Sequence, residues 1–299
     1  MDELIKQLQY DEKESTIFIP NEIFTDLQNH IKKSNHIPFA YSYYYLVNWL
    51  YRYTKYGGLS IDNKTIKSIL GYNPTYTEID YLIKKNGVLD LMGYCSTVKD
   101  YPISWTFEDE ILEFVLLSDI EEEFQKLIKE SRSRKYTIKL PVKSFYRKED
   151  NEDVMDGTYY EFDRTHLIPF EVFLFCMSNK ELGCSGFYLW SYLKMQNQMY
   201  SGYDISLTDL ANETGMTRRT MCTYLTNLRK YRMVDCYHNQ EFFCTALKED
   251  ERKANTYVTK EYDLFSDKPV DIKRIEIVGV DKYLEKLDNK AVYDVIDKW

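Results

Sequence analysis

This chain lacks the features of a membrane or secreted protein. No apolar run approaches the roughly 20 residues that a membrane-spanning helix needs, so the sequence predicts no transmembrane segment. The start of the chain, Met-Asp-Glu-Leu-Ile-Lys, is acidic and amphipathic, without the cationic start and apolar stretch of a secretory signal. We therefore expect a cytoplasmic protein with no membrane partner.

Motifs for nucleotide binding, hydrolysis and metal binding are also absent. None of the 11 glycines is followed by lysine, so there is no Walker A loop. Gly-x-Ser-x-Gly and His-Glu-x-x-His do not occur, and the four histidines include no His-x-His pair, which argues against a rolling-circle nickase. The six cysteines form no Cys-x-x-Cys pair. Cys236, His238 and Cys244 lie close together without zinc-finger spacing or an evident fourth ligand. We predict no enzymatic activity, no cofactor and no metal site.

Aromatic and acidic residues are abundant. With 44% hydrophobic and 16% aromatic residues, the chain has enough apolar surface to fold, and 299 residues allow one large domain or two ordinary ones. Alanine is scarce, and the favoured Tyr, Asn, Lys and Ile have AT-rich codons, so the 28 tyrosines reflect either genome composition or function. The net charge of −9 argues, for the chain as a whole, against nucleic acid, because phosphates bind Lys and Arg.

An internal duplication organises the chain. The hexapeptide IPNEIF at 19–24 recurs as IPFEVF at 168–173. In both copies an aromatic helical stretch follows, then a glycine-containing break and a short amphipathic segment that ends in glycine. These stretches and closing glycines are 43–56 with Gly71 in the first copy, and 187–200 with Gly215 in the second. The repeated order predicts two homologous domains.

The second copy has the local pattern of a helix-turn-helix followed by a hairpin. Gly215 suits a left-handed helix end, and Thr217 can cap the next helix. The apolar stripe of that helix has helical spacing and consists of Met221, Tyr224, Leu225 and Leu228. Residues 234–237 and 255–258 are expected to form two short strands joined by a polar loop.

The stretch at 207–234 reads LTDLANETGMTRRTMCTYLTNLRKYRMV. It resembles the winged-helix domains of bacterial regulators and replication proteins. Shared features are glycine in the turn, Ser/Thr-Arg opening the next helix, and a later Leu-x-x-Leu. The Ile-Pro hexapeptide followed by an aromatic helix is similar to Gram-positive plasmid replication initiators and phage replisome organisers. The resemblance covers roughly 17–118 and 166–262; the chain departs from many of these proteins in being duplicated.

Local patterns and resemblance together predict a mainly α fold with small β-hairpin wings (α+β), built from two homologous winged-helix domains in tandem. The expected parts are an N-terminal segment at 1–16, a first winged-helix domain at 17–130, a basic then acidic linker at 131–157, a second winged-helix domain at 158–265 and a strand-helix tail at 266–299. The apolar stripe of the tail, Val280, Tyr283, Leu284 and Leu287, is expected to pack on the body or on a second subunit.

Positive charge is concentrated in the second helix-turn-helix. Residues 215–232 contain five Lys or Arg and no acid. Arg218 and Arg219 open the helix that enters the major groove in this fold, where Arg pairs with guanine or phosphate. The candidate DNA-binding residues are Thr217, Arg218, Arg219, Thr220, Thr223, Asn227, Arg229 and Lys230 on the helix, and Arg252 and Lys253 before the second wing strand.

The first copy and the linker are weaker candidates. A helix opened by Pro74 would present Glu78 and Asp80, which repel phosphate, so DNA contact and protein binding or dimerisation remain alternatives. The linker at 131–148 carries seven cations and no acid, and it lies either along DNA or against its own acidic flanks. The candidate residues here are Lys64, Lys67, Thr75, Tyr76, Thr77, Arg132, Arg134 and Lys135.

The leading hypothesis is a sequence-specific double-stranded DNA-binding protein of a bacterial mobile element, acting in replication initiation or transcriptional regulation. A transcriptional repressor or activator proper is one alternative. An interaction scaffold whose winged helices bind protein rather than DNA is an alternative of another class. Expected partners are double-stranded DNA, a second copy of the chain, and replication or transcription proteins.

Overall fold

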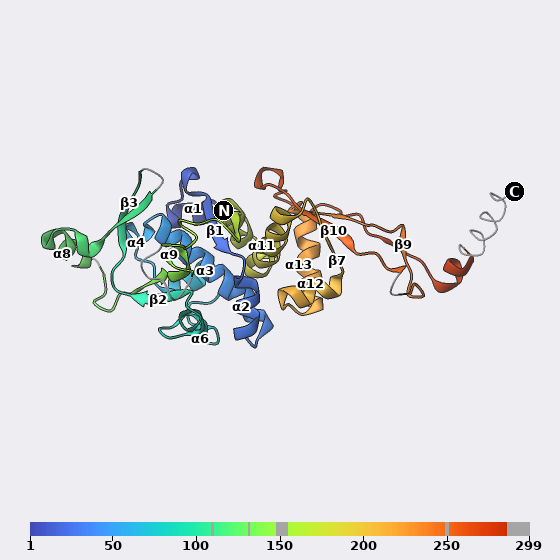
Figure 1. Cartoon of the computed structure of the whole chain (residues 1–299), viewed down its shortest axis with the longest axis horizontal. Helices are drawn as coiled ribbons and strands as arrows, with labels where there is room; N and C mark the ends of the chain where they lie inside the picture. The colour runs from blue at the N-terminus through green and yellow to red at the C-terminus, as the bar shows by residue number, and fades with distance from the viewer. Residues whose placement is uncertain (109–110, 131, 148–154, 249–250, 286–299) are drawn as a thin grey trace.

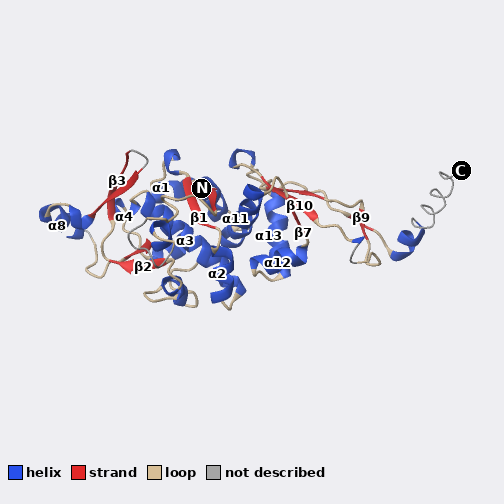
Figure 2. Cartoon of the chain, in the orientation of Figure 1, coloured by secondary structure: helices blue, strands red, loops and turns tan. Residues whose placement is uncertain are grey.

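The computed structural model describes the chain except residues 109–110, 131, 148–154, 249–250 and 286–299. It is about 47% helical and 17% strand, and its described strands form small sheets of two or three strands, which confirms the expected α+β mixture (Figure 2). Among the described helices, none is both long enough and apolar enough to cross a membrane. The molecule is elongated, with α8 and β3 towards one end and β9 towards the other (Figure 1).

The N-terminal half contains most of the short elements. Its helices are α1 (Asp2–Leu8), α2 (Ile23–His30), α3 (Ile37–Arg52), α4 (Lys55–Gly58), α5 (Asn63–Ile69), α6 (Asp80–Ile83), α7 (Val88–Leu91), α8 (Glu122–Glu130) and α9 (Val142–Phe145). Its strands are β1 (Thr16–Pro20), β2 (Cys95–Val98), β3 (Pro102–Glu108), β4 (Ile111–Leu116) and β5 (Ile138–Pro141). Short 3-10 turns lie at Glu12–Glu14, Ser34–His36 and Leu117–Asp119. We call residues 16–145 the first unit.

The C-terminal half repeats the order of a strand, two helices and a helix pair. Its helices are α10 (Phe170–Ser178), α11 (Gly183–Met199), α12 (Leu207–Thr214) and α13 (Arg218–Lys230), with a 3-10 turn at Tyr262–Leu264. Its strands are β6 (Thr165–Pro169), β7 (Tyr203–Ile205), β8 (Val234–Tyr237), β9 (Phe242–Phe243), β10 (Asn255–Thr259) and β11 (Glu276–Ile277). We call residues 165–259 the second unit.

The two copies of the repeated segment pair with each other. β1 and β6 are antiparallel, with Phe18 opposite Leu167, the equivalent position of the other copy. Because equivalent residues face one another there, a local two-fold axis relates the two strands. α3 packs on α11 behind this pair of strands, and the Tyr45 hydroxyl donates to Ile168 O over 3.0 Å. The two repeated segments therefore pair with each other within one chain.

One continuous apolar core joins the units. The apolar side chains of β1, α2 and α3 belong to the same buried cluster as those of α10, α11 and α13. Trp49 of α3 stacks on Phe170 of α10 with 3.9 Å between ring centroids and 8° between ring planes. The aromatic helices expected at 43–56 and 187–200 are the central helices α3 and α11, so their tyrosines face this core.

The second unit follows its sequence pattern closely. Gly215 ends α12 at φ +63°, Thr217 caps α13, and Met221, Leu225 and Leu228 are buried while Tyr224 is half-buried. β8 and β10 pair antiparallel where a hairpin was expected, and β7 adds a third strand in the order β7-β10-β8. These local predictions are confirmed.

The expected linker needs correction. Ile138–Pro141 of the segment 131–157 is β5, which pairs antiparallel with β2 and belongs to the first unit. The hairpin β3-β4 and the helix α8 are inserted between these two strands, which separates them in sequence and hides the pairing. The first unit therefore extends beyond residue 130.

The described part of the C-terminal tail packs on the second unit. β11 runs parallel to β9, and Val278 and Tyr283 are buried against Cys244. Val280 and Leu284 of the expected stripe remain exposed. Leu287 lies outside the described residues.

Candidate nucleic-acid interface

The start of α13 is fixed by its cap and by a close turn. The Thr217 hydroxyl accepts from the Thr220 backbone N–H at 3.3 Å and donates to the Thr220 hydroxyl at 2.8 Å. A Cβ on Gly215 would lie 2.7 Å from Cγ of Gln28 in α2, so the turn before α13 packs tightly on the first unit. The Gln28 amide also donates to Glu213 O at the end of α12. The first unit thus supports the helix from behind.

Burial of one face of α13 sets the direction of the other. Met221, Leu225 and Leu228 are turned into the core. Arg218 and Arg219 are exposed in the first turn, and Thr223, one turn further on, is exposed too. In the part of the chain that the structure describes, neither guanidinium has a hydrogen-bond or ion-pair partner. Two unneutralised cations at a helix N-terminus, where backbone N–H groups also point outward, form a surface suited to phosphate or base edges.

The remaining candidates on α13 are partly engaged. The Thr223 hydroxyl donates to Arg219 O at 3.0 Å, one turn back along the helix. Asn227 donates to Glu181 O at 2.7 Å, and Arg229 donates to Lys273 O in the tail. Lys230 is half-buried. Asn227 and Arg229 therefore hold neighbouring segments, and the free positive charge is at the N-terminal end of the helix.

The wing candidates lie beyond β9. Arg252 donates to Leu247 O at 3.0 Å and to Thr245 O at 3.3 Å, and its guanidinium lies 5.8 Å from the centre of the Phe243 ring. Lys253 is exposed, and its backbone N–H donates to the Gln240 side chain. Arg252 holds the loop between β9 and β10, whereas the Lys253 ammonium has no hydrogen-bond or ion-pair partner among the described residues.

Sequence reasoning missed two cations in the tail. Val270 N–H donates to Lys230 O, so the tail returns along the C-terminal end of α13. Lys273 and Arg274 are exposed next to this end. The residues around Arg229 and Lys230 do not indicate which distant segment packs on the end of α13. The contact with the tail is therefore known only from the tertiary structure.

Within its described residues, the first unit has only the short helix α6 where the second unit has α13. The expected helix from Pro74 does not form, and residues 80–83 make one short turn, α6, instead. The Asn73 side chain accepts from the backbone and the hydroxyl of Thr75, which holds a turn in place of a helix start. After α6 the backbone at Gly87 passes close to the preceding turn. Only glycine fits there, because a Cβ would lie 2.7 Å from Tyr81 O. Thr75 and Thr77 are exposed on this loop, and Tyr76 is half-buried.

Several first-unit cations serve the fold. Lys67 is buried, pairs with Asp80 at 2.5 Å and donates to Tyr76 O, so it does not reach a ligand outside. Hydrogen bonds from Lys33 and Tyr76 lower the pKa of Glu78, which stays ionised and would repel phosphate beside this loop. Lys64 is exposed on α5. Lys67 is the first-copy candidate that the geometry removes.

The cations of the predicted linker divide in the same way. Lys139 is buried against Asp90, and Arg147 forms an ion pair with Glu22 at 2.9 Å. These partners belong to the first unit rather than to the acidic flanks, although the Arg147 N–H donates to Asp156 of one flank at 2.7 Å. Arg132 donates to Gly57 O at 2.8 Å and holds the end of α4. Arg134 and Lys135 are exposed.

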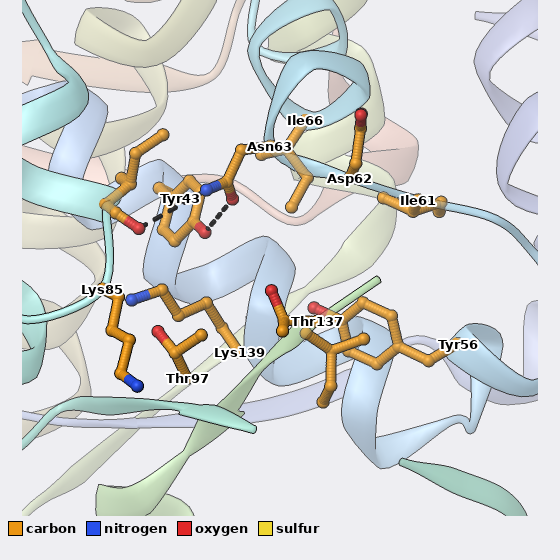
Figure 3. A pocket seen from close by; sticks show the side chains of 12 residues that line it. Tyr43, Tyr56, Ile61, Asp62, Asn63, Ile66, Lys85, Thr97, Thr137 and Lys139 are labelled. Carbon is orange, nitrogen blue, oxygen red and sulfur yellow. Dashed lines mark hydrogen bonds between the residues drawn. The ribbon is translucent and has the colours of Figure 1, made fainter. Parts of the chain in front are cut away.

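A small cavity of about 100 Å³ lies behind α5, between α3 and the strands β2 and β5 (Figure 3). Tyr43 donates to the Asn63 side chain at 2.6 Å along its wall. Lys139 reaches the same cavity but is neutralised by Asp90. Among the described residues that line it, the Tyr56 hydroxyl has no hydrogen-bond partner and the Lys85 ammonium has no ion pair.

Comparisons with known proteins identify no relative: no family model, no curated protein and no solved structure matches this chain.

Proposed function

We propose that this chain is a sequence-specific double-stranded DNA-binding protein made of two winged-helix units, of which the second reads DNA. Support for the winged-helix assignment comes from element order. In the second unit α11, α12 and α13 precede the hairpin β8-β10, and β7 lies between the first two helices. In the first unit α3, α5 and α6 precede the paired strands β2 and β5.

The proposed DNA-contacting element is the N-terminal turn of α13. In a winged helix this turn enters the major groove, where Arg can bond guanine O6 and N7 in a bidentate manner or pair with phosphate. Arg218 and Arg219 have the required exposure, and Lys253 and the tail cations Lys273 and Arg274 are suited to the flanking backbone. The binding needs no cofactor and involves no covalent step.

Asymmetry between the units is part of the proposal. The helix that would read DNA in the first unit is broken, and its nearby Lys67 is committed to Asp80. The first unit instead packs against the α12–α13 turn through Gln28. One chain would therefore present one DNA-contacting helix, supported by both units.

The observation that carries this proposal is the unpaired, exposed Arg218–Arg219 pair at the capped start of a helix whose opposite face is buried. The test is a salt-titrated binding assay on DNA fragments selected by the protein. Arg218→Ala/Arg219→Ala should weaken specific binding by about 100-fold or more, since each such contact contributes about 1–3 kcal/mol.

A charge-matched control separates contact from net charge. Lys6→Ala/Lys13→Ala removes two exposed cations of the N-terminal segment and should leave specific binding almost unchanged. If both arginines bind phosphate, the slope of log affinity against log salt falls by about 2 in the arginine variant. The proposal would be contradicted if the DNA affinity of the wild-type protein did not depend on salt concentration. Equal losses of affinity in the arginine variant and the lysine control would contradict it too.

The biological role we propose is replication initiation on a mobile element, with transcriptional regulation as the alternative. Footprinting on DNA next to the gene distinguishes them: protection of a repeated element supports initiation, and protection of a promoter supports regulation. The acidic balance of the chain, −9, suits either role because it disfavours random duplex.

An interaction scaffold is the second candidate, and one observation favours it. α8 projects at one end of the molecule with Phe124 57% exposed and Leu127 65% exposed (Figure 1). Large exposed apolar side chains on one helix are typical of a protein-binding surface. A scaffold would show no fragment preference and no loss in the arginine variant.

A further inference from the structure

A second cationic site lies in the first unit, far in sequence from α13. It is a cavity of about 300 Å³ between the start of β3 and the segment that follows α8. Lys99, Lys129, Arg132 and Arg134 line it together with Tyr101 and Tyr136. No acidic residue is among the described residues that line it. Four like charges around one cavity repel one another, and an anion removes this cost.

Arg132 is held rigidly at the wall of this cavity. Its Nη2 donates to the carbonyls of Tyr56 and Gly57. Its guanidinium lies 4.5 Å from the ring centre of Tyr101 and 4.8 Å from that of Tyr136. A guanidinium fixed on two sides keeps its orientation without a ligand, which lowers the entropy cost of binding one.

Two buried donors of this cluster lack acceptors. Arg132 Nη1 and the Tyr101 hydroxyl have no hydrogen-bond partner within the described residues. Burial raises the pKa of Tyr101 more than the neighbouring Arg132 lowers it, so the phenol stays protonated and cannot neutralise the arginine. Two acids adjoin the cluster in sequence. Asp100 accepts from the hydroxyl and the backbone N–H of Ser118, and Glu130 is exposed at the end of α8 and is not among the residues that line the cavity. The cluster therefore combines unneutralised positive charge with unused donors.

The other surface of the cavity is apolar. Tyr101 and Leu117 are buried, and Tyr136 is half-buried with its hydroxyl donating to Ile61 O at 3.1 Å. Aromatic rings beside cations suit an anion that also has a flat or apolar part. The volume is at the lower end of the range for small-molecule sites.

We propose that this cavity binds the phosphate of a nucleotide, with Lys99, Lys129 and Arg134 around the phosphate and the tyrosine wall beside the base. The phosphate comes either from a free mononucleotide or from nucleic acid. The chain has no Walker A loop, so the proposal is binding without hydrolysis. It does not depend on α13, and its test is independent of the DNA-reading proposal.

Isothermal titration calorimetry of the full chain tests this. The titrants are adenosine monophosphate, guanosine monophosphate, inorganic phosphate and a short duplex without a selected site. Lys99→Ala/Arg134→Ala should weaken nucleotide binding about tenfold or more, because two charge-assisted contacts are lost. The matched control is Lys32→Ala/Lys126→Ala, two exposed cations of the first unit that do not line the cavity, and it should change affinity less than about twofold.

The arms of the experiment separate the sources. If a mononucleotide binds saturably and the Lys99→Ala/Arg134→Ala variant loses this binding, the ligand is a free nucleotide. If only the duplex binds saturably and the variant loses that binding, the phosphate belongs to nucleic acid. Retained nucleotide binding in the Arg218→Ala/Arg219→Ala variant shows that this site is separate from α13. No saturable binding of any titrant, or equal losses in both charge variants, overturns the proposal.

Discussion

At the scale of single residues, charge in this protein is used in two ways. Lys67, Lys139 and Arg147 lie against acids of the first unit and stabilise the fold. Arg218 and Arg219 face solvent without partners in the described chain. Counting charges along the sequence treats all five alike, because the difference arises from partners that are distant in sequence, such as Glu22 for Arg147.

His166 is a fully buried histidine at the junction of the two units. It is fully buried in β6; its Nδ1–H donates to the Asn21 side chain, and its Nε2 accepts from Tyr41, each over 2.9 Å. Burial lowers the pKa of His166 to about 3, so the folded protein keeps it neutral.

This low pKa predicts loss of stability in acid. Between the ordinary histidine pKa of about 6.5 and the folded value, the unfolded state binds the proton and the folded state does not. The stability contribution is complete above pH 6.5 and falls as pH decreases, by up to about 1.4 kcal/mol per pH unit. His166→Gln should therefore lower the free energy of unfolding at neutral pH but flatten its dependence on pH.

Urea unfolding between about pH 7 and pH 5 measures this effect. The control is His30→Gln, which alters an exposed histidine and should keep the wild-type pH profile. A His166→Gln profile parallel to wild type would show that other groups cause the acid sensitivity.

At the scale of elements, the α12–α13 turn differs from its counterpart in the first unit. Both turns have a glycine at positive φ, Gly71 at +78° and Gly215 at +63°. After Gly215, Thr217 caps a helix of 13 residues. After Gly71, Asn73 forms its own turn with Thr75, so the first unit has the glycine without the helix.

Gly215→Ala should destabilise the protein and, under the proposed function, weaken DNA binding as well. An L-residue in the left-handed conformation costs about 1–2 kcal/mol, and the new Cβ would also collide with Gln28 at 2.7 Å. Thermal unfolding and DNA affinity report the two effects. Gly279→Ala is the matched control, because a Cβ there meets nothing within 4 Å, and it should leave both quantities near wild type. Equal stability of the two variants would contradict the role of this turn.

At the scale of the whole molecule, the two units share one core. β1 pairs with β6, and Trp49 of the first unit stacks on Phe170 of the second. The interface is internal to the chain and apolar, as in an obligate dimer. We therefore expect the two units to fold together rather than as two independent domains.

Separating the copies should abolish folding. Fragments 1–157 and 158–299, expressed alone, would each expose half of the shared aromatic core, so neither should show a cooperative thermal transition by circular dichroism. Co-expression of both fragments is the control and should restore a complex with native-like unfolding. Cooperative unfolding of either fragment alone would mean that the units are independent domains.

The sequence by itself determined the second unit in detail. The turn at Gly215, the cap at Thr217 and the buried stripe of α13 depend on residues a few positions apart, and such local rules can be read from one chain. The repeated landmarks were also visible in the sequence, because they keep their order.

Three features were decided by the tertiary structure alone. They are the pairing of β1 with β6, the pairing of β5 with β2, and which cations have acidic partners and which face solvent. Each depends on contacts between residues far apart in the chain: β5 is separated from β2 by an inserted hairpin and helix, and Arg147 lies 125 positions from Glu22. Periodicity and capping rules act within one or two turns, so they contain no information about such partners. For that reason α13 was predictable from its own residues, whereas the contacts of the first unit that support it were not.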